Sequence, residues 1–294
     1  MAITAALVKE LRERTGAGMM ECKKALVETD GDIEAAIEAM RKSGMAKADK
    51  KAGRVAAEGV IVIQTDAAAK NAAIVEVNCE TDFVAKGDDF INFANGVCAQ
   101  VLADPAVSLE SLNDKKIGTD SDATIDERRR EMIAKIGENM SIRRIATMST
   151  SGTLGVYLHG SRIGVVVDME GGDNDLARDV AMHVAASKPL CVNESEIDPT
   201  ILAKEKEIFA AQAKESGKPD NIIEKMVEGR VKKYVNEVTL LGQAFVKDPD
   251  TSVADLLNKA NATVIGFQRF EVGEGIEKKT ENFADEVMAQ VKGS

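Results

Sequence analysis

The sequence contains no tryptophan, and its other aromatic residues are rare. Aromatic residues make up 3% of the 294 positions. Proteins that bind single-stranded nucleic acids stack bases on aromatic side chains, and proteins that bind the phosphate backbone neutralise it with lysine and arginine. This chain instead has a formal net charge of −11. Both observations argue against a nucleic-acid partner.

Cysteine and histidine are also scarce. Four cysteines are spread along the chain: Cys22, Cys79, Cys98 and Cys191. No two of them form a C-x-x-C pair, so their spacing predicts neither a zinc site nor a disulfide framework. The two histidines, His159 and His183, belong to no H-E-x-x-H or similar ligand cluster. We therefore expect buried thiols, no metal site and no cofactor.

Long apolar runs are absent as well. No stretch reaches the roughly 18 consecutive apolar residues that a membrane span requires, and residues 1–6 lack the basic and apolar pattern of a secretion signal. Hydrophobic residues nevertheless make up 44% of the chain, which is enough for more than one core. We expect a soluble, cytoplasmic protein of several domains, with no membrane partner.

The sequence also lacks the motifs of an enzyme. It has no G-x-x-x-x-G-K-[ST] stretch, and the glycines at 16–18 follow a predicted helix, whereas a dinucleotide-binding loop follows a strand. Cys79 and His183 could in principle form a thiol pair, but a buried cysteine at the end of a strand is much commoner. We expect a protein that is not an enzyme.

The first 43 residues predict three helices. Helical spacing of Leu7, Val8 and Leu11 indicates the first helix, with Thr4 as its N-cap. Glycines break the pattern before a second helix at about 19–28. Asp32 is expected to cap a third helix from 33 to about 42, which Gly44 would end.

A basic segment follows at 41–54. Six basic residues stand there against Asp49 alone: Arg41, Lys42, Lys47, Lys50, Lys51 and Arg54. This composition indicates an exposed connector, which is either a solvated linker or a contact with an acidic partner surface. We predict that residues 1–54 form an N-terminal domain with this connector.

The remainder contains a degenerate internal repeat of strand, strand and helix, followed by a further helix and a late strand. In the first copy the two strands, the first helix and the late strand are predicted at 60–64, 73–78, 90–102 and 141–148. In the second copy they are predicted at 154–159, 162–168, 176–187 and 263–272. The expected fold class is α+β, with one core subdomain at 55–148 and another at 149–190 and 238–275.

An insertion at 191–237 interrupts the second copy. Apolar residues recur there at helical spacing on both sides of a turn at 216–219, so an antiparallel helical hairpin is predicted. Its apolar stripe either offers a docking surface or closes on itself.

A polar turn with one aromatic residue follows the strand at 74–77. Phe83 lies in this turn between Asp82 and Val84. It is either a core residue packed under the loop or a wedge presented to a partner, because aromatic side chains flanked by charge at a loop tip are typical interface anchors.

Several stretches resemble the elongation factor Ts family of bacteria. Residues 11–26 (LRERTGAGMMECKKAL) are similar to the amino-terminal signature of that family, and residues 81–85 (TDFVA) match its second signature. The likeness continues at 135–139, 183–186 and 270–275 and extends over almost the whole chain. Two departures are Glu80, where glutamine is common, and a longer segment at 109–125.

The resemblance implies an architecture and an activity. The N-terminal domain would be ubiquitin-associated-like, the core two-part, the insertion a coiled coil, and residues 276–294 a C-terminal helix. The partner would be elongation factor Tu, from which the protein would promote release of GDP. The complex would be one-to-one or two-to-two.

The resemblance also implies site residues. One set would disturb the Mg²⁺ site of the partner: Thr81, Asp82, Phe83 and Val84. A second set would bind its nucleotide-binding domain: Lys9, Lys23, Ile136, Gly137, Asn139 and His159. Val246 would contact another domain, beside Lys247 where methionine is often expected. The alternative function is a passive adaptor or holding chaperone that binds proteins without altering nucleotide affinity.

Overall fold

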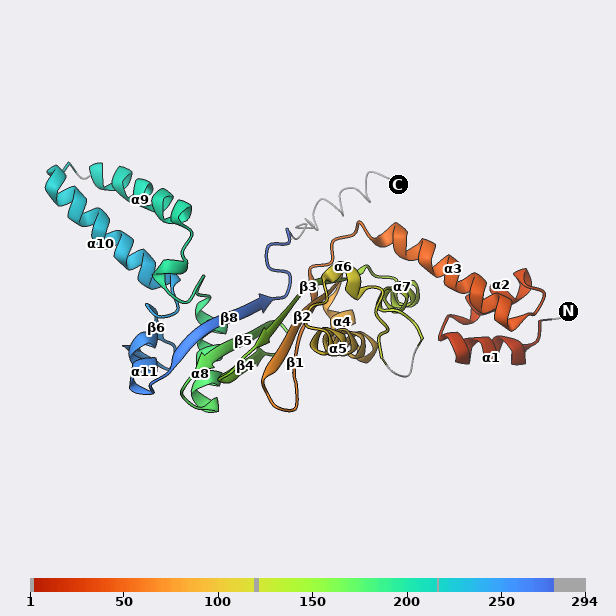
Figure 1. The fold of residues 1–294 in the computed structure, drawn as a ribbon. Helices are drawn as coiled ribbons and strands as arrows, with labels where there is room; N and C mark the ends of the chain where they lie inside the picture. Colours follow the sequence, from red (N-terminus) through yellow and green to blue (C-terminus); the bar gives the residue numbers. More distant parts are fainter. Residues whose placement is uncertain (1–2, 119–121, 216, 278–294) are drawn as a thin grey trace.

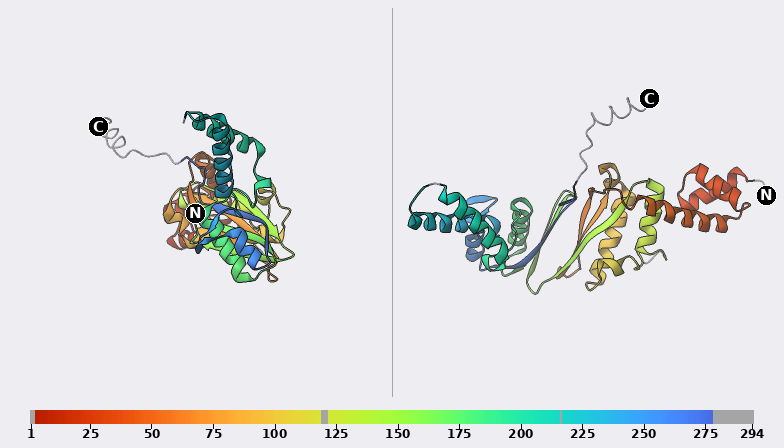
Figure 2. Two further views of the ribbon diagram at one scale, coloured as in Figure 1. Left: turned by 90° about the vertical axis from the view of Figure 1, so that its left-hand side faces the viewer. Right: turned by 90° about the horizontal axis from the view of Figure 1, so that it is seen from above.

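The computed structural model describes residues 3–118, 122–215 and 217–277, and the molecule is elongated (Figure 1). Three N-terminal helices lie at one end, two β-sheets with their helices form the middle, and a helical hairpin lies at the other end (Figures 1 and 2). The predicted α+β class is confirmed.

The N-terminal unit contains the three expected helices. They are α1 (Ala5–Thr15), α2 (Met19–Glu28) and α3 (Ile33–Lys51). Both predicted caps are present, because the Thr4 hydroxyl accepts from the Leu7 amide at 3.3 Å and the Asp32 carboxylate accepts from the Ala35 amide at 3.0 Å. Leu11, Cys22 and Leu26 are fully buried in a small core of this unit.

The prediction that Gly44 ends the third helix is wrong, because α3 continues to Lys51. Gly44 is buried against helix α7 (Ile125–Ile136), and a Cβ atom added to it would lie 3.3 Å from Cβ of Ala134. The glycine therefore lets two helices approach closely.

Most side chains of the segment at 41–54 are exposed, as expected, but the segment is not a free linker, because it is helical as far as Lys51 and buries Gly44 and Ala48. Its helical part packs on α7, and Arg41 pairs with Glu131 at 3.5 Å. Lys51 donates to the carbonyl of Gly137, and Arg54 pairs with Glu80 at 2.7 Å. Arg41, Lys51 and Arg54 thus bind the protein's own carboxylates and a carbonyl.

The first sheet has the antiparallel order β1-β2-β3. Its strands are β1 (Glu58–Thr65), β2 (Asn71–Cys79) and β3 (Met140–Ser149). Helices follow between β2 and β3: α4 (Asp82–Ala85), α5 (Asp88–Ala103), α6 (Leu109–Leu112) and α7. The apolar faces of α5 and α7 cover one side of the sheet and bury Phe90, Val97 and Ile133 against it.

The second sheet has the antiparallel order β4-β5-β8. Its strands are β4 (Thr153–His159), β5 (Ile163–Glu170) and β8 (Thr263–Glu271). Helix α8 (Asn174–Ser187) covers its outer side, beside a small lobe of β6 (Ala244–Phe245), β7 (Asp248–Ser252) and α11 (Val253–Lys259). The predicted elements of both halves are confirmed, while their origin in a degenerate repeat stays a prediction.

The two sheets pack face to face through a shared apolar layer, with helices outside each (Figure 2). Ile61 and Ile74 of the first sheet meet Val166 and Phe270 of the second. Gly164 makes this approach possible, because a Cβ atom there would lie 2.5 Å from Cγ2 of Ile61.

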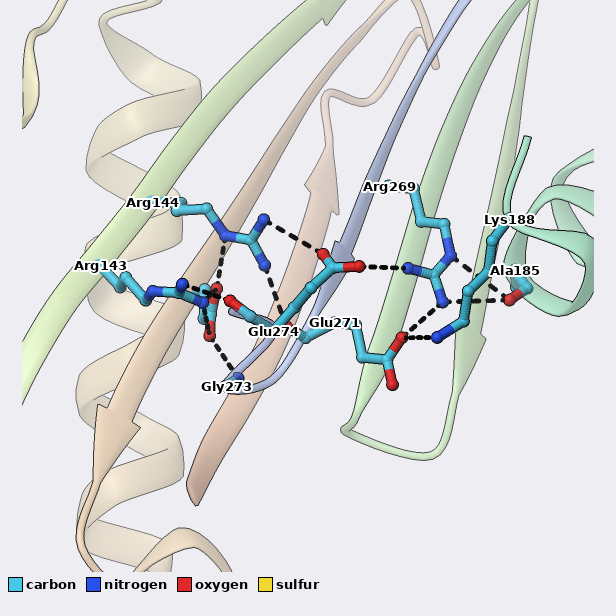
Figure 3. A network of polar contacts seen from close by, with 9 residues as sticks. Arg143, Arg144, Ala185, Lys188, Arg269, Glu271, Gly273 and Glu274 are labelled. Carbon is cyan, nitrogen blue, oxygen red and sulfur yellow. Dashed lines mark hydrogen bonds and ion pairs between the residues drawn. The ribbon is translucent and has the colours of Figure 1, made fainter. Parts of the chain in front are cut away.

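A polar network joins the sheets beside this layer (Figure 3). Glu76 is fully buried and pairs with Arg143 at 3.1 Å and Arg144 at 2.6 Å. A β-bulge leaves Arg143 without a partner position in β2, so two consecutive arginines reach the same carboxylate. Glu76 also accepts from the amide of Gly273, which follows β8.

The same network continues to α8. Arg144 donates to the carbonyl of Glu271 at 2.9 Å and lies 4.5 Å from the centre of the Phe270 ring. Glu271 in turn pairs with Arg269 at 2.7 Å and Lys188 at 2.5 Å (Figure 3). The first sheet, β8 and α8 are therefore connected through charged side chains. We call this set, with Glu76 at its centre, the sheet joint.

The insertion forms an antiparallel pair of helices, α9 (Pro199–Lys214) and α10 (Asp220–Val238), after a short turn of 3-10 helix (Glu194–Glu196). Ala213, Ile223 and Val227 are buried between the helices, and Phe209 stacks edge-on against Tyr234 at 6.3 Å. The apolar stripe thus closes largely on itself, although Ile201 and Ile222 remain exposed.

Two remaining expectations concern membranes and the C-terminus. Within the described ranges, no helix combines the length and apolar character needed to cross a membrane. The predicted C-terminal helix of 276–294 lies almost entirely outside the described residues.

Candidate partner-binding surface

The segment at 80–85, which follows β2 and which we call the Phe83 loop, presents Phe83 to solvent. Thr81 is the N-cap of α4, and its hydroxyl accepts from the Val84 amide at 3.4 Å. Ala85 is buried and Val84 packs against the core that the first sheet forms with α5 and α7, which we call the first core. The opposite side of this single turn therefore faces outward. Phe83 is 85% exposed. The structure therefore excludes the interpretation of Phe83 as a core residue packed under the loop.

Asp82 adds a negative charge beside this ring. Its carboxylate is exposed and pairs with Lys86 at 2.6 Å. The hydrogen bond from Lys86 and its positive charge lower the pKa of Asp82 below the ordinary value. The loop therefore presents an aromatic ring next to a carboxylate that is ionised at neutral pH.

The predicted residues of the 136–139 segment lie beneath this loop. Ile136 packs against the first core, and Gly137 ends α7 in the left-handed conformation at φ 90°. Asn139 is 6% exposed, and its side chain donates to the carbonyls of Arg54 at 2.7 Å and Ala52 at 3.3 Å. This segment connects α7, the end of α3 and the Phe83 loop.

Two glutamates fasten the two segments to each other. Glu138 accepts from the Thr81 amide at 3.0 Å and from its hydroxyl at 2.7 Å, and Glu80 accepts from the Asn139 amide at 2.5 Å. The sequence patterns did not indicate Glu138, and they marked Glu80 only as a departure from the family. The structure explains that departure, because a carboxylate at position 80 can also pair with Arg54.

His159 reaches the same edge of the molecule from the second sheet. It is exposed at the β4–β5 turn, with the Tyr157 hydroxyl 3.2 Å from its Nδ1. The adjacent Arg162 pairs with Glu58 at 2.7 Å, and Glu58 lies opposite Cys79 in the first sheet. The turn that carries His159 is thus held near the strand end that precedes the Phe83 loop.

Val246 lies elsewhere, on the small lobe next to α8. It is 43% exposed, and its amide donates to Nδ1 of His183 at 3.1 Å. His183 is fully buried and its Nε2 lies 2.9 Å from the side-chain oxygen of Gln243. Lys247, where a methionine is expected, pairs with Asp179 of α8 at 2.5 Å.

Lys9 and Lys23 are both exposed on the N-terminal unit. Lys9 lies 3.7 Å from Glu13, and Lys23 has no carboxylate within 4.0 Å in the part of the chain that the structure describes. Met20 and Val27 are 74% and 57% exposed on the same helix as Lys23. This apolar pair was not predicted, although positions 20, 23 and 27 have the spacing of one helix face.

The thiol and histidine considered as a catalytic pair lie apart in the structure. Burial raises the pKa of the Cys79 thiol to about 12, and the thiol donates to the carbonyl of Thr81 at 3.1 Å. His183 is hydrogen-bonded to Gln243 at the core of the second sheet, whereas Cys79 lies in the first core. Cys79 and His183 therefore do not form a catalytic pair. Among the described residues no three His, Cys, Asp or Glu side chains gather as metal ligands.

Known proteins match the chain along its whole length. The family profile described as Elongation factor TS matches residues 80–274. The chain is similar to the protein named Elongation factor Ts from Methylococcus capsulatus, with 61% identity over all of both chains. It is 60% identical to that of Thioalkalivibrio sulfidiphilus over all of both chains, and 56% identical to that of Legionella pneumophila over 99% of each.

Proposed function

Because the chain belongs to the elongation factor Ts family of translation factors, we propose that it binds elongation factor Tu and promotes the release of bound GDP. The supporting observation is Phe83, which is 85% exposed on a loop anchored to the sheet. A large aromatic side chain gains little from exposure to water and much from insertion into a partner's pocket.

The loop would act on the Mg²⁺ site of the partner. Mg²⁺ requires near-octahedral geometry and is held in nucleotide sites by few protein ligands, so a small displacement of those ligands weakens its binding strongly. Phe83 would insert beside this site and Asp82 would reorder nearby polar contacts. Thr81 and Val84 would hold the loop, since one caps α4 and the other packs into the core.

Other exposed regions would supply affinity. Lys9 and Lys23 would bind the nucleotide-binding domain together with the apolar side chains of Met20 and Val27. His159 would add a contact at the edge where the Phe83 loop lies. Ile136, Gly137 and Asn139 would support this surface from beneath, since none of the three is fully exposed.

Val246 would contact a second domain of the partner. Binding at two places would hold a conformation of the partner that fits nucleotide poorly. The coupling is reciprocal, so nucleotide with Mg²⁺ must weaken binding of this protein by the same factor. In this proposal the protein acts in the cytoplasm, carries no catalytic residue and needs no cofactor.

A passive adaptor or holding chaperone is the second candidate, and the exposed apolar residues Ile201, Ile208 and Ile222 of the hairpin favour it. Stopped-flow release of fluorescent GDP from elongation factor Tu distinguishes the two functions. An exchange factor raises the release rate by orders of magnitude at substoichiometric amounts, whereas an adaptor leaves the rate unchanged.

A further inference from the structure

The hydrogen-bond ladder between β2 and β3 is extended by side chains at the Phe83 loop. The last paired residues of the two strands are Cys79 and Met140. Beyond them Glu80 accepts from the amide of Asn139 at 2.5 Å, and Glu138 accepts from the amide of Thr81 at 3.0 Å. Carboxylates thus take the place that strand carbonyls occupy in the ladder.

The contact at Glu138 controls the start of α4. The Thr81 hydroxyl donates to Glu138 at 2.7 Å, which leaves its lone pairs directed at the Val84 amide at 3.4 Å. Helix α4 is only four residues long, and so short a helix has no independent stability in water. The direction of Phe83 therefore depends on how firmly Thr81 is held.

We infer that Glu138 is a positioning residue that holds Thr81 and, through it, the exposed ring of Phe83 in the orientation needed for nucleotide release. This inference rests on the proposed function. Glu80 supports it from the other side, because it holds the amide of Asn139, next to Glu138, and pairs with Arg54 at 2.7 Å.

The first test is the rate of GDP release from elongation factor Tu at saturating amounts of each full-length variant. Glu138→Ala should reduce this rate about tenfold, which corresponds to the loss of about one charge-assisted hydrogen bond. Its affinity for nucleotide-free Tu should not change. Glu138→Gln should restore most of the rate, because its amide can still accept from the Thr81 amide and donate to the Thr81 hydroxyl.

Thr81→Val removes the hydroxyl and keeps the shape of the side chain, so it gives a second test that does not depend on the folding of Glu138→Ala. It should also slow GDP release. Asp104→Ala is the matched control, because Asp104 is a surface carboxylate that pairs with Lys115 at 2.9 Å, away from the loop. It should release GDP at the parental rate.

A double-mutant cycle with Phe83→Ala separates positioning from general destabilisation. If Glu138 acts through Phe83, adding Glu138→Ala to Phe83→Ala should cause no further loss of rate. Additive losses, or a Glu138→Ala protein as fast as the parent, would overturn the positioning role. A parent that does not accelerate GDP release would instead overturn the proposed function.

Discussion

Phe83 has the largest exposed fraction among the exposed large apolar side chains of the described residues, at 85%. A buried phenylalanine truncated to alanine typically costs about 3 to 5 kcal/mol of stability. Phe83→Ala should leave the unfolding midpoint unchanged, because the ring is already in water. The coupling free energy, by which this protein and nucleotide weaken each other's binding to elongation factor Tu, should fall by about 1 to 3 kcal/mol. This corresponds to a change of about 5- to 150-fold in the nucleotide affinity of Tu.

Urea unfolding and GDP release, measured on the same Phe83→Ala preparation, check both parts of this prediction. Chelation of Mg²⁺ serves as the internal control, because a wedge has less to displace once the ion is gone, so the difference between variant and parent should narrow. An exchange defect of equal size with and without Mg²⁺ would contradict the wedge.

The second prediction at the residue scale concerns His183 and pH. Burial lowers the pKa of His183 below its ordinary value of 6.5, because the folded protein disfavours the charged ring. The unfolded chain therefore binds the proton more readily, so stability is complete above about pH 6.5 and falls as the pH drops below it. Protonation also removes the acceptor at Nδ1 that the Val246 amide uses.

His183→Gln should reduce this pH dependence, since glutamine does not titrate and can accept from the same amide. The measurement is the urea midpoint of both proteins at about pH 7.5 and about pH 5.5. The parent should lose more stability than the variant over this interval. Equal losses would show that other groups cause the acid sensitivity.

At the scale of elements, the strands and most helices could be predicted from the sequence. Their apolar residues recur at the period of a strand or of a helix, and this period can be recognised within a short stretch of the chain. Gly44 could not be interpreted in this way. Glycine commonly ends a helix, and only the tertiary contact with Ala134 of α7 shows why this one lies inside α3.

The site was only partly predictable for a similar reason. Phe83 was found as a candidate, but its exposure depends on the cap at Thr81 and on the packing of Val84. Glu138 is 57 positions from Thr81 and meets it only through the register of β2 and β3. Contacts of this kind leave no periodic pattern in a single sequence.

The hairpin of α9 and α10 provides the prediction for an element. Its buried seam is separate from the core of the second sheet, and its ends meet where the Leu190 amide donates to the Val238 carbonyl at 2.8 Å. Joining Asn193 to Val238 through a short turn should therefore leave the denaturant midpoint of the core close to that of the parent. Association with elongation factor Tu should slow more than GDP release.

Denaturant titration and stopped-flow binding at several Tu concentrations check this prediction. Substitution of the exposed Ile201 and Ile222 by serine is the milder control, because it keeps the hairpin and removes only its outward apolar surface. Collapse of core stability on excision would mean that the hairpin supports the second sheet.

At the scale of the whole molecule, the proposed contacts lie on different parts of the core. The Phe83 loop extends from the first sheet, His159 lies at the β4–β5 turn of the second sheet, and Val246 lies on the small lobe next to α8. Binding energy at one region can strain the partner at the other only if the protein does not bend between them. The shared apolar layer with Gly164 and the sheet joint around Glu76 are the structures that resist this bending.

Glu76→Ala tests the sheet joint. Removing one partner of a buried charge pair typically costs about 3 to 5 kcal/mol of stability, and because Arg143 and Arg144 are partly exposed we expect a loss of about 3 kcal/mol. Exchange per folded molecule should also fall, because the two contact regions lose their fixed separation.

Lys115→Ala, which breaks the exposed pair with Asp104, is the control and should cost about 0 to 1 kcal/mol. Urea unfolding and GDP release are measured for both variants in parallel. If Glu76→Ala unfolds like Lys115→Ala, the sheet joint contributes no more than a surface pair. If it is destabilised but exchanges normally once corrected for its folded fraction, the two contact regions act independently and rigidity between the sheets is not part of the mechanism.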